Sequence, residues 1–147
     1  MTLKETINAA MTDAMKAKDE TRKIPLKLVM AAIKEAEIEK REDLEEDEVL
    51  RLVQKEVKAR QESIADAKKA GREDLIATAK AEMAVLQEYL PEGLSPEELE
   101  AILKETINEI GATSMADMGK IMQAVMPKVQ GRADGGQVNQ LVRKLLG

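Results

Sequence analysis

The stretch Leu90-Pro91-Glu92-Gly93-Leu94-Ser95-Pro96-Glu97-Glu98 decides how this chain is organised. A proline disfavours helix at the residue before it, and Gly93 loosens the chain further. Ser95 then has the features of a helix start: a serine cap, a proline at the first helical position and a glutamate three residues on. We therefore expect two domains, an N-terminal one over residues 1–90 and a C-terminal one over residues 94–147.

Apolar residues on both sides of this break recur at three- and four-residue steps, which is the period of amphipathic helices. The composition agrees, because the chain is rich in Ala, Glu, Lys, Leu and Arg. The pattern predicts an all-α fold, with an N-terminal bundle of about four helices followed by a small three-helix C-terminal domain.

Local signals place the helix boundaries. Thr2 begins the first helix, since Glu5 completes a capping box with it. The second helix is expected to begin near Thr21, because Pro25 is tolerated only near a first turn. Two more helices are expected in the N-terminal domain, over about 47–70 and over about 72–90, the latter with Leu75 on its inner face. In the C-terminal domain, helices are expected from Ser95 to Gly111, from Asp117 to Pro127 or Gly131, and from Asp134 onward.

The residue types exclude several chemistries. Among 147 residues there is no His and no Cys, so an imidazole base, a thiol nucleophile, a Ser-His-Asp triad and a structural zinc site are all excluded. A single aromatic residue, Tyr89, leaves almost nothing on which bases can stack. We expect no catalytic residue, no metal and no cofactor.

The chain has no segment that favours a membrane. Its longest uncharged run, residues 135–142, is far shorter than the roughly 20 residues of a membrane helix. Charged residues follow Met1 closely, so no signal peptide is visible. A cytoplasmic protein is the expectation.

Charge is unevenly distributed along the chain. The net charge is −5, yet residues 118–147 carry five basic residues against one acid, Asp134, and residues 1–117 carry −9. Such asymmetry can orient a protein on a polyanion. The alternative is that these residues form an ordinary solvated face, because cations are also favourable near helix C-termini. The candidate RNA-binding residues are Lys120, Lys128, Arg132, Arg143 and Lys144.

Three further features have a structural and a functional interpretation. The glycine-rich stretch 131–136 is not a nucleotide-hydrolysing loop, but its backbone donors beside Arg132 suit one RNA phosphate. The second basic cluster, from Lys58 to Arg72, is interleaved with acids, which favours ordinary surface pairing. The nine Met residues fit core packing better than a groove for a partner.

Short motifs along nearly the whole chain resemble the YqeY family, in the order which that family shows. They are Lys58-x-Arg60-x-x-Ser63-Ile64, Gly71-Arg72-x-Asp74-Leu75, Tyr89-Leu90-Pro91, Leu94-Ser95-x-Glu97-Glu98, Asp117-Met118-Gly119-Lys120-x-Met122, Met126-Pro127-Lys128 and Gly131-Arg132-Ala133-Asp134-Gly135, followed by Val138-Asn139. The family is similar to the tail domain of the B subunit of aspartyl/glutamyl-tRNA amidotransferase. The resemblance implies that the C-terminal part is a three-helix tail-like module.

The resemblance also implies a function. In the amidotransferase this tail contacts tRNA, so we expect an accessory protein that binds tRNA or structured RNA through backbone phosphates, with amidotransferase or translation-related proteins as further partners. One alternative is the carbon–nitrogen ligase activity, with glutamine as amido-N-donor, that is associated with the family. The ATP-using kinase region and the amidase subunit are both absent from this sequence. Another alternative is a non-catalytic protein-interaction module.

Overall fold

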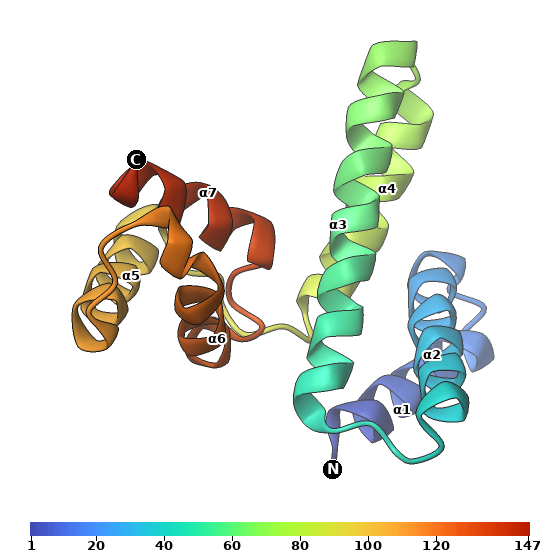
Figure 1. Cartoon of the computed structure of the whole chain (residues 1–147). Helices are drawn as coiled ribbons and strands as arrows, with labels where there is room; N and C mark the ends of the chain where they lie inside the picture. The colour runs from blue at the N-terminus through green and yellow to red at the C-terminus, as the bar shows by residue number, and fades with distance from the viewer. The chain divides into compact units, whose positions relative to one another are not determined.

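The computed structural model describes all 147 residues and consists of seven α-helices and one short 3₁₀ helix, without strands (Figure 1). The all-α prediction is therefore confirmed. The chain divides into two compact units, Met1–Pro91 and Glu92–Gly147, within the proline- and glycine-containing stretch. None of the helices is long and apolar enough to cross a membrane.

The N-terminal unit has four helices: α1 (Leu3–Lys16), α2 (Glu20–Lys40), α3 (Glu46–Ala70) and α4 (Glu73–Gln87). The helices α3 and α4 form a long hairpin, and α1 and α2 pack near its open end, so that the closed end of the hairpin extends beyond them (Figure 1). The core consists of aliphatic side chains from all four helices: Ile7, Leu26, Val29, Ile33, Val49, Val53, Val57, Val85 and Leu86.

Local chemistry explains the beginning of α1 and the end of α3. The Thr2 hydroxyl accepts the Glu5 N–H at 3.2 Å, and the Glu5 carboxylate accepts the Thr2 N–H, so the predicted capping box is confirmed. Gly71 ends α3 with φ +68°, a left-handed conformation that glycine adopts at little cost.

The prediction for Pro25 is wrong. The second helix begins at Glu20, capped by the Asp19 carboxylate, and Pro25 lies beyond the first turn, buried in a continuous helix. Because Pro25 has no N–H, the Thr21 carbonyl loses its helical hydrogen bond. Thr21 is exposed, so water can hydrate this carbonyl while the proline ring adds to the buried face.

The hairpin of α3 and α4 corrects two further predictions. Ile76, not Leu75, is the buried residue at the start of α4: Ile76 is 7% exposed and Leu75 is 48% exposed. Arg60 is not a surface residue: its side chain is 10% exposed, its Nη1 donates to Glu56 Oε2 at 2.5 Å, and its Nε lies 3.5 Å from Glu82 Oε1. Arg60 thus links the two helices through a partly buried ionic cluster.

The C-terminal unit has three α-helices, α5 (Pro96–Ile110), α6 (Met118–Val129) and α7 (Gly135–Leu146), with the 3₁₀ helix Met115–Asp117 before α6. Ser95 caps α5 in the predicted capping box. The core is formed by Leu99, Leu103, Ile121, Val125, Val129, Ala133, Val138 and Val142.

Asp117 precedes α6 at the N-cap position, as predicted, and of the two predicted terminators Gly131 is the one that the structure supports. The Asp117 carboxylate does not cap α6; instead its Oδ2 accepts the Thr113 N–H at 3.1 Å and closes the preceding loop. Pro127 does not end the helix, which continues to Val129. Gly131, at φ +76°, turns the chain toward α7.

Candidate nucleic-acid interface

The helices α6 and α7 and the loop between them hold the five predicted RNA-binding residues. Two of these side chains have free ammonium groups. Lys120, in the first turn of α6, and Lys144, in the last turn of α7, are exposed and make no hydrogen bond or ion pair. Both ammonium groups are therefore available to a phosphate oxygen without breaking an existing contact.

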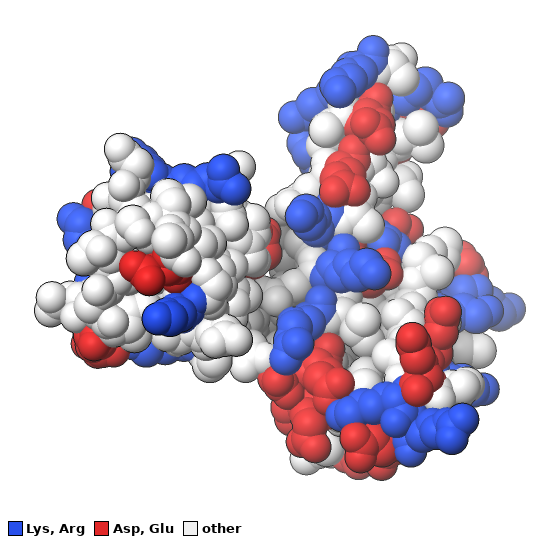
Figure 2. All heavy atoms as spheres, in the orientation of Figure 1, with Lys and Arg blue, Asp and Glu red and all other residues white.

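Arg143 is partly engaged. Its Nε donates to Asn139 Oδ1 at 2.7 Å, one turn earlier on α7, while its two terminal nitrogens have no partner within the protein. A guanidinium held in this way presents the outer edge of its fork, which suits bidentate contact with a phosphate. Arg143 and Lys144 are neighbours in sequence, and Figure 2 shows Lys and Arg side chains over α7.

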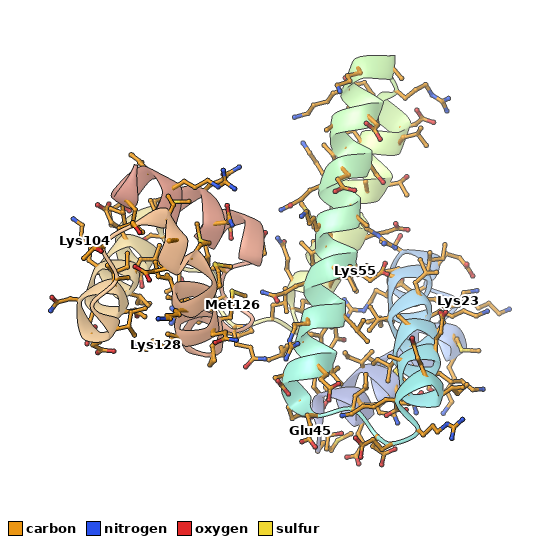
Figure 3. The ribbon with its side chains drawn as sticks, in the orientation of Figure 1. Lys23, Glu45, Lys55, Lys104, Met126 and Lys128 are labelled. Carbon is orange, nitrogen blue, oxygen red and sulfur yellow. The ribbon has the colours of Figure 1, made fainter.

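Lys128 is committed to another helix. Its Nζ donates to Thr106 Oγ1 at 3.0 Å and to Glu109 Oε2 at 3.1 Å, both on α5. Figure 3 shows Lys128 on the side of α6 toward α5. Thr106 is fully buried and its hydroxyl also donates to the Ile102 carbonyl at 2.8 Å. Lys128 therefore joins α6 to α5 and satisfies a buried hydroxyl group.

Arg132 is committed to the segment before α5. Its Nε donates to the Glu92 carbonyl at 2.9 Å, and its own carbonyl accepts the Leu94 N–H at 3.0 Å. A terminal nitrogen also lies 3.9 Å from Glu98 Oε2. Hydrogen bonding to Ser95 is the main reason why the pKa of Glu98 is lowered, and the Arg132 charge adds to it.

The glycine-rich loop differs from the predicted phosphate cradle. Asp134 caps α7: its Oδ1 accepts the Gln137 N–H at 2.8 Å, and the Gln137 side chain accepts the Asp134 N–H at 3.1 Å. A carboxylate thus already occupies the positive end of this helix. A phosphate placed there would be repelled by Asp134.

The sign of the charge differs between the helices of the C-terminal unit. The five candidate cations lie on α6, α7 and the loop between them, whereas α5 is acidic and its one basic residue, Lys104, is 3.0 Å from Glu100. The acids of α5 are Glu97, Glu98, Glu100, Glu105 and Glu109. Lys128 lies 3.1 Å from Glu109 and Arg132 3.9 Å from Glu98, so the positive charge that is not balanced by α5 belongs to Lys120, Arg143 and Lys144.

The structure shows a second surface, in the N-terminal unit, where the sequence favours core packing for the methionines over a groove for a partner. Met11, Met15 and Met30 line a groove of about 550 Å³ between α1 and α2, and Met15 is 51% exposed. The signal was present as lysines at two-turn spacing on α2, Lys27 and Lys34, beside the methionines of α1. The structure shows no group of three acidic side chains arranged to hold a metal ion.

Comparison with known proteins gives two relatives. The E subunit of the glutamyl-tRNA(Gln) amidotransferase of Thermococcus sibiricus is 44% identical over 55 residues, which is 37% of this chain and 9% of that protein. The chain therefore spans a small part of that relative. Altered inheritance of mitochondria protein 41 of Pyrenophora tritici-repentis is 25% identical over 144 residues, 96% of this chain and 79% of that protein.

A family model agrees with the motifs and with the likeness to the tail region of amidotransferase subunits. The model of Yqey-like proteins matches residues 4–146, through both structural units. On this match, which extends over almost the entire chain, the protein belongs to the family of Yqey-like proteins.

Proposed function

We propose that the protein is an accessory RNA-binding protein that holds tRNA or another structured RNA by its phosphates through α6 and α7. The observation that carries the proposal is the group of uncompensated cations on these helices, Lys120, Arg143 and Lys144, in a chain whose net charge is −5. The likeness to an amidotransferase subunit named for glutamyl-tRNA supports tRNA as the RNA.

Contacts of this kind position an RNA without reading its sequence, because lysine and arginine meet phosphate oxygens and not base edges. Each neutralised phosphate releases condensed counterions, so affinity should fall with salt by about 0.7–0.9 log units per tenfold change and per contact. With Tyr89 as its one aromatic residue, the chain lacks the stacking platform of single-strand binders. A folded RNA is therefore the better ligand.

Lys128 and Arg132 have a different part in this proposal. Their head groups are bonded to Thr106, Glu109 and the Glu92 carbonyl, so they shape the unit that presents the free cations. Their replacement should lower the thermal stability of the C-terminal unit as well as RNA affinity. Weaker RNA binding after replacement of Lys128 and Arg132 would therefore not by itself identify these residues as phosphate contacts.

The experiment compares two double substitutions that remove the same charge. Lys120→Gln with Lys144→Gln removes two free cations of α6 and α7, and Lys68→Gln with Lys69→Gln removes two exposed cations at the end of α3. Binding of labelled tRNA is measured by anisotropy over a salt series. The first variant should bind about tenfold more weakly near 0.1 M salt and lose about 1.5 from the log–log slope, with unchanged circular dichroism. Equal weakening by both variants would contradict the proposal.

An accessory role is proposed because the chain spans only 9% of the amidotransferase relative. No contact in the structure favours carbon–nitrogen ligase chemistry over this role. Glutamine- and ATP-dependent amide formation by the isolated protein would overturn the accessory assignment. A cytoplasmic location stays a prediction, since one relative is named as mitochondrial.

A further inference from the structure

The groove between α1 and α2 has an apolar floor that no part of the N-terminal unit covers. Ile33 is fully buried at its base, Met30 and Met11 are half-buried, and Met15 is 51% exposed. The flexible, polarisable side chain of methionine adapts to differently shaped apolar partners, which is why it recurs at binding surfaces. The exposed thioether of Met15 at this floor thus gives a surface that can reshape around a guest.

The rim of this groove is positively charged. Lys27 and Lys34 lie seven residues apart on α2, both are exposed, and neither has an ion-pair or hydrogen-bond partner. Two helical turns separate them, or about 10 Å. The remaining lysine that lines the groove, Lys4, is paired: its Nζ is 2.7 Å from Glu37, which also accepts the Leu44 N–H at 3.1 Å. Two unpaired cations therefore stand beside an apolar floor in a chain that is acidic as a whole.

We propose that this groove binds an acidic amphipathic helix of a partner protein. The positive rim selects carboxylates, and the methionine floor selects an apolar stripe. A guest helix lying along the groove would place two carboxylates seven residues apart, two turns, opposite Lys27 and Lys34. The floor extends from Lys4 to Met15 on α1, about 16 Å, which accommodates about three turns of helix. The proposal is independent of RNA binding by the C-terminal unit.

The probe is a synthetic amphipathic peptide of about four helical turns with a leucine stripe and two glutamates seven residues apart. Its control has lysines in place of these glutamates. Methyl NMR of the methionines in the full chain gives the readout. The signals of Met11, Met15 and Met30 should shift on titration, and those of Met118 and Met126 in the C-terminal unit should not.

Charge reversal tests the rim. Lys27→Glu with Lys34→Glu should weaken binding of the acidic peptide about tenfold and should strengthen binding of the lysine peptide. The matched control, Lys55→Glu with Lys58→Glu, makes the same change at exposed positions of α3 and should change affinity less than twofold. Lys27→Gln with Lys34→Gln serves as a milder variant in case the reversal disturbs folding.

Several results would overturn the proposal. They are equal binding of the two peptides, equal effects of the two charge-reversed variants, or no shift of the groove methionines up to about millimolar peptide. Shifts of these signals with phosphatidylglycerol vesicles but not with the acidic peptide would assign the groove to a lipid surface instead. Weaker binding by Met15→Gln, a change at an exposed side chain, would confirm the apolar floor as the contact.

Discussion

Replacement of Arg60 by methionine should destabilise the N-terminal unit far more than a surface substitution. The Arg60 guanidinium is bonded to Glu56 on its own helix and lies near Glu82 on α4. Methionine fills much of the same volume but leaves two carboxylates facing each other without a counter-charge. Their side chains are 22% and 14% exposed, so water screens their repulsion incompletely.

The magnitude follows from the burial of the cluster. Removing one partner of a fully buried ion pair costs about 3–5 kcal/mol, because the remaining charge stays desolvated. The three side chains here are 10–22% exposed, so we expect about 2–3 kcal/mol for Arg60→Met. For a unit of this size, that corresponds to a Tm lower by about 10–20 °C.

The assay uses the position of the one aromatic residue. Tyr89 packs against the core of the N-terminal unit, so tyrosine fluorescence in a urea titration follows this unit, whereas far-UV circular dichroism follows both. The triple variant with Glu56→Gln and Glu82→Gln removes the uncompensated charges and should recover at least half of the loss. Arg60→Met within about 0.5 kcal/mol of the wild type, or no recovery in the triple variant, would refute this reasoning.

Three further predictions concern both units. Leu103→Ala, at a fully buried position of α5, should cost about 3 kcal/mol in the C-terminal unit, as measured by amide hydrogen exchange of its core. Ser95→Ala should cost about 1 kcal/mol in the same measurement, because the Glu98 N–H loses its cap. The hydrogen bond from Lys4 is the main reason why the pKa of Glu37 is lowered in the folded chain. The stabilisation by ionised Glu37 is therefore present above pH 4.5 and is lost as the pH falls through the lowered pKa of Glu37 in the folded chain. Glu37→Gln should flatten this part of the profile of unfolding free energy against pH, as measured by urea titrations at each pH.

The sequence predicts helices well where the deciding chemistry is local. The capping boxes at Thr2 and Ser95 form as expected, and a third forms at Asp134, where the last helix is expected to begin; each involves residues three positions apart. The glycine terminators Gly71 and Gly111 likewise depend on backbone conformation at a single residue. Such signals need no knowledge of the tertiary structure.

Predictions that depend on distant partners did less well. Arg60 is read from sequence as a surface residue, because its partner Glu82 belongs to the next helix. The choice between Leu75 and Ile76 as the inner residue depends on the rotation of α4 against α3, which adjacent apolar residues cannot fix. Pro25 is tolerated inside α2 because the carbonyl it leaves unbonded is at the exposed face.

The same limit applies to the candidate interface. The five cations of α6, α7 and their loop look equivalent in the sequence, yet the structure separates free ammonium groups from those bonded within the unit. Lys128 is engaged by Thr106, 22 residues earlier, and Arg132 by Glu92, 40 residues earlier. Neither spacing forms a recognisable motif. Charge counting therefore finds the region, and only tertiary contacts tell which cations are free.

Anisotropy of labelled total tRNA titrated with the full chain over a salt series, with double-stranded DNA as control, tests RNA binding most directly. We predict binding in about the micromolar range that favours tRNA over DNA and weakens steeply with salt. No binding at low salt, or equal binding of both nucleic acids, would contradict the account.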